Sequence, residues 1–133
     1  MEQNPLFEKY GQTIDAGKVI FNEGDVGDHM YIIQAGRVRI SKMIDGREHE
    51  LAVLEKGDFF GEMAIVSRIA RTATATAVNA TQLLAFDRQG FMSMIEKNAK
   101  IALNVIDKLC RRLQNANSQI QMMFQRNQRS LIA

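Results

Sequence analysis

The amino-acid sequence predicts an α+β protein that is mainly β, with a sandwich or barrel of short strands followed by a short helix and a long C-terminal helix. Three observations support this fold class. Glycines recur at short intervals in the first half of the chain, runs of β-branched and apolar residues lie between them, and neither Gly nor Pro occurs from residue 99 onward. A chain of 133 residues is long enough for one domain with a core of its own.

Short strands are expected between the glycine turns, because turn signals at intervals of about 8–12 residues are typical of small β domains. Asp45-Gly46 predicts a hairpin, since a type I′ turn needs positive φ at both central residues. Alternating polar and apolar residues over Arg37–Ser41 indicate a strand with one solvent-facing side. The expected strands are Lys18–Phe21, Met30–Gln34, Arg37–Lys42, His49–Leu54 and Thr72–Val78.

A long helix is expected from Ala99, after a short helical segment at Arg88–Glu96. Its apolar residues alternate in spacing between four and three, which is the a/d pattern of a coiled coil over about three heptads. A lone helix would not keep such a face in water, so it packs on the strands, on a second copy, or on both. We favour a dimer, and the alternative is one core helix of a monomer. This apolar seam consists of Ala102, Ile106, Leu109, Leu113, Ala116, Ile120 and Met123.

These patterns divide the chain into three parts. Residues 1–98 are expected to form the strand domain with short flanking helices. Residues 99–129 are expected to form the long helix of the same domain, with a role as dimerisation helix or lid, and residues 130–133 a tail.

The composition excludes several classes of protein. Hydrophobic residues make up 46% and charged residues 24% of the chain, an ordinary balance for a soluble domain. A net charge of +2 does not indicate a nucleic-acid binder, and no apolar run approaches the roughly 20 residues of a membrane span. The N-terminus lacks a secretory pattern, so a cytoplasmic location is expected.

The chemistry-bearing residues do not assemble into a catalytic or metal site. The single cysteine, Cys110, rules out an intrachain disulfide and is expected to be inert core. His29 and His49 are far apart in sequence and are expected to face solvent. No serine lies in a G-x-S-x-G turn. We therefore expect no catalytic residue, no metal and no cofactor.

The stretch "FGEMAIVSRIARTATATA", residues 60–77, does suggest a binding site, and we call it the cassette. Gly61 lets backbone approach a ligand, and the N–H groups at the start of a following helix favour an anion. The planar donors of Arg71 suit a phosphate, while the Glu62 carboxylate can accept from a ribose hydroxyl. The pattern indicates a ribose phosphate ligand. The alternative is a Glu62–Arg71 ion pair that braces a turn.

The sequence resembles the cyclic-nucleotide-binding domain family, which includes bacterial regulators of the catabolite activator type and regulatory subunits of cyclic-AMP-dependent kinase. "LAVLEKGDFFGEMAIVSRIARTATATA" resembles the family's phosphate-binding cassette, F-G-E-x-A followed by P-R-x-A-T. "GKVIFNEGDVGDHMYIIQAGRVRI" resembles its opening strands. The resemblance covers about Thr13 to Met123. It implies an eight-stranded antiparallel β-roll, a jelly-roll-like double-stranded β-helix, and a cyclic nucleotide as ligand.

The resemblance also implies roles for residues of the cassette. Glu62 would accept a hydrogen bond from the ribose 2′-hydroxyl, and Arg71 would pair with the phosphate oxygens. The Thr72 hydroxyl would reach the phosphate or a purine edge. Backbone groups for the cyclic phosphate and ribose would come from Gly61, Met63 and Ala64.

The resemblance places the base between an apolar wall and the long helix. "CRRLQNAN" resembles the stretch of the bacterial regulators that caps the base. Two positions depart from the family pattern: Ala70 replaces a proline before the arginine, and Ala116 replaces a hydroxyl residue, which leaves Asn117 as the substitute. The wall would consist of Phe60, Leu51 and Ile40, and the helix would contribute Arg112 and Asn117.

These patterns predict a non-enzymatic cyclic nucleotide sensor that changes the position of its C-terminal helix in signal transduction. Cyclic AMP (cAMP) is the favoured ligand, and cyclic GMP (cGMP) is compatible with Thr72. We expect no DNA-binding domain after the long helix, so the chain is either a free-standing sensor or one domain of a longer protein. Neither nucleic acid nor membrane is expected as a partner. The alternative is a ligand-free interaction or dimerisation module with a degenerate pocket.

Overall fold

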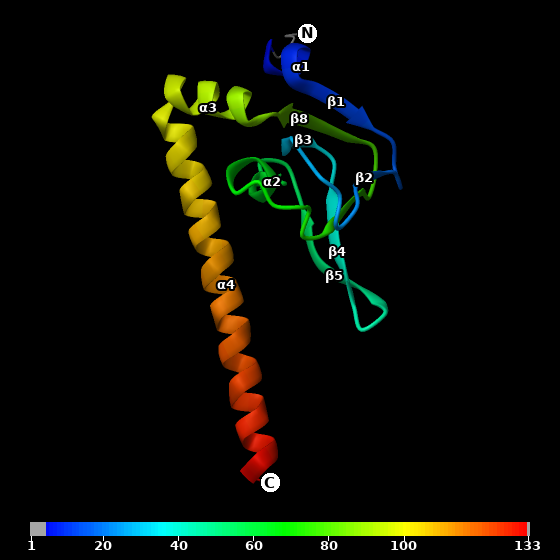
Figure 1. Ribbon diagram of the computed structural model, residues 1–133, viewed down its shortest axis with the longest axis vertical. Helices are drawn as coiled ribbons and strands as arrows, with labels where there is room; N and C mark the ends of the chain where they lie inside the picture. The colour runs from blue at the N-terminus through cyan, green and yellow to red at the C-terminus, as the bar shows by residue number, and fades with distance from the viewer. Residues whose placement is uncertain (1–4, 133) are drawn as a thin grey trace. The chain divides into compact units, whose positions relative to one another are not determined.

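The structure is a computed structural model that describes residues 5–132, with side chains described as far as residue 128. The chain divides into two compact units, Met1–Phe91 and Met92–Ala133 (Figure 1). The strands lie in the first unit, and the described part of the second unit is helical.

Within residues 5–132, eight antiparallel strands form two four-stranded sheets, ordered β1-β8-β3-β6 and β2-β7-β4-β5. This arrangement confirms the predicted β-roll. The strands are β1 (Gly11–Ile14), β2 (Val19–Phe21), β3 (Met30–Ala35), β4 (Val38–Ile44), β5 (Arg47–Leu54), β6 (Phe59–Phe60), β7 (Thr74–Ala77) and β8 (Thr81–Phe86).

The predicted hairpin joins β4 to β5. Asp45 and Gly46 have φ values of 53° and 76°, as a turn with two left-handed central residues requires. The predicted alternation along β4 is wrong, because Val38 and Ser41 are both buried although they are three positions apart. The pairing with β5 shifts register between Ile40 and Ser41, where a bulge makes Leu51 the extra residue.

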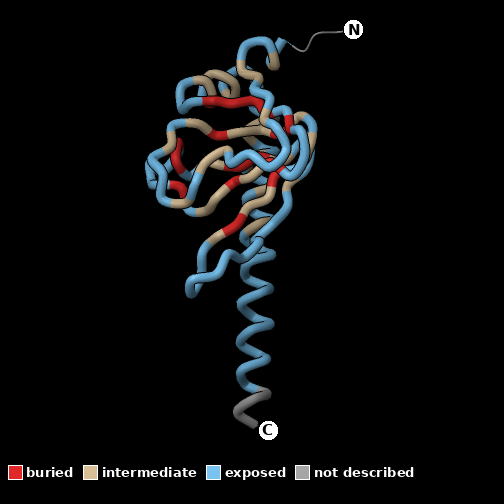
Figure 2. The backbone as a smooth tube through the Cα atoms, turned by 90° about the vertical axis from the view of Figure 1, so that its right-hand side faces the viewer, coloured by how far each residue is buried: buried red, intermediate tan, exposed pale blue. Residues whose placement is uncertain are grey.

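The core of the first unit lies between the two sheets. Figure 2 shows the buried stretches in red along the backbone. β8 pairs with β1 and β3 and is also contacted by α1, where the Tyr10 and Phe86 rings lie 4.5 Å apart, and "TQLLAF" is buried almost throughout. We did not predict β1, β6 or β8, because none of them shows an alternating pattern. The core cluster consists of Ile33, Val38, Phe60, Ala75 and Leu83.

Four helices accompany the strands in the part of the chain that the structure describes. α1 (Pro5–Tyr10) precedes β1, and α2 (Glu62–Val66) follows β6. α3 (Arg88–Lys97) begins at the predicted residue and ends one residue after the predicted segment. The Asp87 carboxylate caps it by accepting a 2.7 Å hydrogen bond from the Gly90 N–H.

The second unit is dominated by α4 (Ala99–Ile132), a continuous helix as predicted. It extends into the expected tail, of which Ala133 lies outside the described residues. Along the apolar seam, Ile106, Leu113 and Ile120 are exposed. Cys110 is also exposed, so its expected place in a core is wrong, because it lies beside the seam and not within a packed interior.

Candidate functional site

Gly61 begins the site at the junction of β6 and α2. Its φ of 84° is left-handed, which favours glycine, and it occupies the N-cap position of α2 without a capping side chain. A Cβ at this position would lie 2.7 Å from Arg71 Nη1 and 3.2 Å from the His29 carbonyl oxygen. Glycine is therefore needed here both for its backbone conformation and for the space that it leaves to the arginine.

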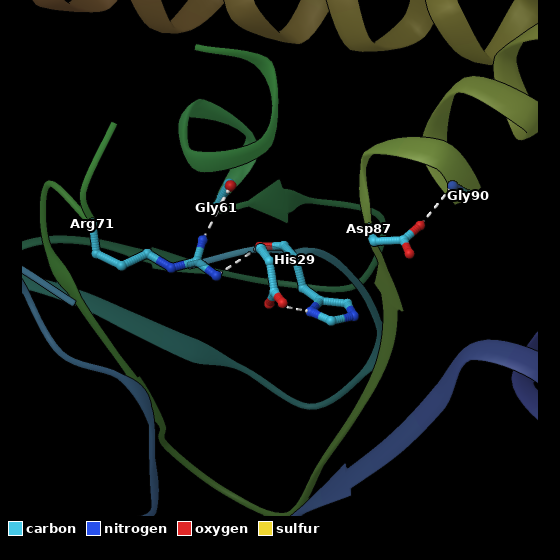
Figure 3. A network of polar contacts seen from close by, with 6 residues as sticks. His29, Gly61, Arg71, Asp87 and Gly90 are labelled. Atoms are coloured by element: carbon cyan, nitrogen blue, oxygen red, sulfur yellow. Dashed lines mark hydrogen bonds and ion pairs between the residues drawn. The ribbon is translucent and has the colours of Figure 1, made fainter. Parts of the chain in front are cut away.

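Arg71 is the centre of the site, and its side chain is buried although it is charged. Only 6% of the residue is exposed. Its guanidinium donates 2.7 Å from Nη2 to the His29 carbonyl and 3.1 Å from Nη1 to the Gly61 carbonyl (Figure 3). Nε is buried and has no hydrogen-bond partner among the described residues. Arg71 thus presents a desolvated cation whose hydrogen-bond acceptors are neutral carbonyls.

Burial acts on the charge of this arginine more than its neighbours do. Desolvation lowers the pKa of the Arg71 guanidinium, and nearby Tyr31, Asp28, Asp25 and Glu62 oppose this shift in decreasing order. Glu62 has the smallest of these effects. A charge held this way is destabilised until an anion approaches it.

Main-chain and side-chain hydrogen bonds fix the backbone on both sides of Arg71. Its N–H donates 2.9 Å to the Asp25 carbonyl, and its own carbonyl accepts 2.8 Å from the Gly24 N–H. One residue later, the Thr72 carbonyl accepts 2.9 Å from Lys42 Nζ, which also lies 3.5 Å from Glu23 Oε2. The loop after β2 and strand β4 therefore hold the cassette in place.

The two histidines have different surroundings. The His29 ring lies 2.7 Å from the Asp28 carboxylate, from Nδ1 to Oδ1, and this contact lowers the pKa of Asp28 (Figure 3). His49 is exposed on β5. No group of three His, Cys, Asp or Glu side chains that could hold a metal occurs in the described part of the chain.

The predicted site residues of the first unit differ in burial. Phe60 is buried in the core cluster, and Ile40 packs against that cluster from β4. Met63 and Leu51 are about half exposed, at 47% and 53%. The remaining members are Gly61, Arg71, the half-buried Glu62, the buried Ala64 and the exposed Thr72.

The two predicted base contacts belong to the second unit. Arg112 and Asn117 lie on α4, on opposite flanks of the apolar seam. Their place against the base stays a prediction.

Sequence reasoning missed three residues around the arginine: Phe21, Gly27 and Tyr31. The Arg71 Cζ atom lies 4.0 Å from the centroid of the Phe21 ring and 6.0 Å from that of Tyr31. Gly27 leaves the space beside the Nε–Cζ edge, where a Cβ would overlap the guanidinium. The glycine-rich stretch "EGDVGD" was the available signal for Gly27, whereas nothing local marks Phe21.

A hollow of about 500 Å³ adjoins the cassette in the first unit. It is lined by the loop after β2, by the part of the cassette that precedes Arg71, and by the start of α3. Ala70, which stands where the resemblance implies proline, is one of its lining residues.

The geometry agrees with a comparison to known protein families. Residues 12–98 match the family model described as cyclic nucleotide-binding domain. The chain belongs to this family. No helix among the described residues is both long and apolar enough to cross a membrane.

The relatives of this cyclic nucleotide-binding domain include regulators and kinase subunits. It is 35% identical over 118 residues to a protein named cyclic AMP receptor protein from Thermus thermophilus, which covers 88% of this chain and 55% of the relative. The crystal structure of the Thermus thermophilus catabolite activator protein matches with a TM-score of 0.79 and 32% identity, over 89% of this chain and 56% of that one. The chain thus spans about half the length of these relatives.

A further neighbour is the EAL enzyme Bd1971 in its cAMP-bound form. It matches with a TM-score of 0.61 and 33% identity, over 89% of this chain and 32% of that chain. The same enzyme is also a neighbour in its cGMP-bound form, with a TM-score of 0.60 and 33% identity over 77% of this chain and 27% of that one.

Proposed function

We propose that this domain binds a cyclic nucleotide at the cassette, with cAMP as the favoured ligand and cGMP as a second candidate. The observation that carries the proposal is the buried guanidinium of Arg71, which has two neutral carbonyl partners and an unsatisfied Nε. A phosphate oxygen supplies the charge-assisted partner that this desolvated cation needs. Glu62, at the start of α2, accepts from the ribose 2′-hydroxyl.

The remaining contacts of the ligand follow from the same arrangement. Backbone groups of Gly61, Met63 and Ala64 face the cyclic phosphate and ribose, and the Thr72 hydroxyl reaches the phosphate or the base. The apolar side chains of Phe60, Ile40 and Leu51 contact the purine, and Arg112 and Asn117 approach it from α4. The relative named cyclic AMP receptor protein supports cAMP, whereas Bd1971 has structures with either nucleotide.

The function that we propose is that of a non-enzymatic sensor in signal transduction. Ligand changes the position of α4, and it can do so only by binding one arrangement better than another. α4 also forms a homodimer through its apolar seam, whose exposed side chains include Leu113 at 63% and Ile120 at 64%. The exposed seam equally supports the second candidate, a dimerisation module that binds no nucleotide.

Calorimetric titration with cAMP and cGMP tests the proposal. The wild-type chain should bind at least one of them, and Arg71→Gln should weaken binding by about 2–5 kcal/mol, because the phosphate loses a desolvated partner. Arg68→Gln is the matched control, since it removes the same charge from an exposed position of the same segment. If neither nucleotide binds at millimolar concentration while a sizing column shows a dimer, the second candidate is correct.

A further inference from the structure

The guanidinium of Arg71 rests on an aromatic surface that no motif of the sequence indicates. Arg71 Cζ lies 4.0 Å from the centroid of the Phe21 ring, well within the distance of a cation–π contact. The Phe21 ring is itself held by two others, with centroid distances of 6.1 Å to Tyr31 and 5.8 Å to Phe60. Tyr31 and Phe60 are stacked 5.2 Å apart. The face of the guanidinium therefore contacts a ring that neighbouring aromatic side chains hold in place.

The edges of the same group are confined as well. A Cβ on Gly27 would overlap Nε and Cζ, and a Cβ on Gly61 would lie 2.7 Å from Nη1. The carbonyls of His29 and Gly61 accept from Nη2 and Nη1. The two hydrogen bonds act within the plane of the guanidinium and leave its tilt out of that plane less restrained. The Phe21 ring, which contacts the face of the group, limits this tilt.

This restraint has a consequence for binding. An arginine that is loose before binding loses side-chain entropy when it pairs with a phosphate, and affinity falls accordingly. A buried arginine is usually ordered by a carboxylate, but the two hydrogen-bond acceptors of Arg71 are neutral carbonyls. We propose that Phe21 is the positioning residue of the phosphate-binding arginine: its ring orders the Arg71 guanidinium before the cyclic nucleotide arrives. This inference rests on the proposed function.

Three substitutions separate positioning from packing. Phe21→Leu keeps an apolar side chain but removes the π face, and cAMP should bind it roughly threefold to thirtyfold more weakly than the wild type. Phe21→Tyr keeps the π face and should restore affinity. Tyr31→Phe keeps the neighbouring ring, at 6.0 Å from Arg71 Cζ, and should bind like the wild type. If Phe21→Leu does not fold, Phe21→Met takes its place.

Nuclear magnetic resonance on the ligand-free chain can detect the ordering of Arg71 directly. A Phe21 side chain that only filled space in the core would not produce the signals described here. The Arg71 Nε–H proton, identified by its loss in Arg71→Gln, should be shifted upfield by the Phe21 ring and protected from exchange with water. Both properties should persist in Phe21→Tyr and disappear in Phe21→Leu.

The outcomes distinguish the inference from the proposed function. A wild-type chain that binds neither cAMP nor cGMP contradicts the proposed function, and the inference with it. A wild-type chain that binds cAMP through Arg71, with Phe21→Leu equally tight or Phe21→Tyr equally weakened, overturns the inference alone. An unshifted Nε–H proton in the wild type also overturns it.

Discussion

The two units of the molecule differ in which side chains they bury, and each departs from the usual pattern. In the strand unit a cation is buried, with Arg71 only 6% exposed, whereas in the helical unit apolar side chains such as Leu113 are 63% exposed. Charged residues are almost never fully buried without a partner, and rows of exposed large apolar residues mark interaction surfaces. The proposed function gives each unit a complement, an anion for the first and the apolar seam of a second copy for the second.

The difference lies in how specific each complement must be. Under the proposed function, the buried guanidinium of Arg71 selects a small ligand with correctly placed oxygens, because its hydrogen-bond donors are directional. The apolar seam has no directional groups, and its affinity depends on the area that it buries. Four substitutions test this contrast, from the largest expected effect to the smallest.

Leu113→Asp should break the interaction of the helical unit. A carboxylate at the centre of a packed seam has no partner, and an uncompensated buried charge costs about 3–5 kcal/mol. Sedimentation equilibrium should show a shift from dimer to monomer. Gln114→Asp is the matched control, because it adds the same charge one position away from the seam, and it should leave the dimer intact. A monomeric wild-type chain, or a dimer that tolerates Leu113→Asp, contradicts the proposed dimer seam.

The sequence predicted those features of the fold and of the candidate site that depend on residues close together in the chain. The Asp45-Gly46 turn needs only the backbone freedom of its own residues, and the seam of α4 needs only the helical period. Gly61 and Arg71 could be found because the cassette is contiguous in sequence. β6 could not, because two residues carry no period, and β8 could not, because it is buried almost throughout, with α1 packed against it, and so shows no alternation.

The contacts of Arg71 could not be predicted because its partners are distant in the sequence. Phe21 and His29 are 50 and 42 positions away from it in the sequence, and they meet it only because two sheets fold over each other. The sequence predicted an arginine for phosphate, but the alternative that it left open was a pair with Glu62. That its hydrogen bonds go to two carbonyls, and its face to a ring, depends on packing that no local pattern encodes.

Gly61→Ala should lower both the stability of the strand unit and its affinity for cyclic nucleotide. A non-glycine residue at a φ of 84° costs about 1–2 kcal/mol, and the new Cβ would crowd Arg71 Nη1 at 2.7 Å. Gly46→Ala is the control, because its φ of 76° is similar but no atom lies within 4 Å of the added Cβ. Urea unfolding should show a loss for both, and cyclic nucleotide affinity should fall only for Gly61→Ala. Equal affinity in the two variants would mean that the space beside Arg71 is not used.

Lys42→Met should loosen the cassette without touching Arg71. It removes the 2.9 Å hydrogen bond to the Thr72 carbonyl and the 3.5 Å ion pair with Glu23. Since the pair is partly exposed, we expect a loss of about 0.5–1.5 kcal/mol in the free energy of unfolding. Lys18→Met, at an exposed position before β2, should change it by less. A Lys42→Met variant as stable as Lys18→Met would show that the cassette is held by its backbone bonds alone.

Asp28→Asn should have the smallest effect, and pH reveals it better than stability at neutral pH. His29 lowers the pKa of the Asp28 carboxyl below its usual value of 3.8 in the folded chain. A depressed pKa contributes stability that is present above the unfolded pKa and is lost as pH falls through the folded pKa. The wild type should therefore lose a small increment of stability below about pH 4 that Asp28→Asn lacks.

Because Asp28 is exposed, its loss should leave the buried carbonyl contacts of Arg71, and hence cyclic nucleotide affinity at neutral pH, almost unchanged. A strong loss of affinity in Asp28→Asn would mean that the cation in the strand unit depends on a surface carboxylate, and the contrast between the two units would be weaker than their burial indicates.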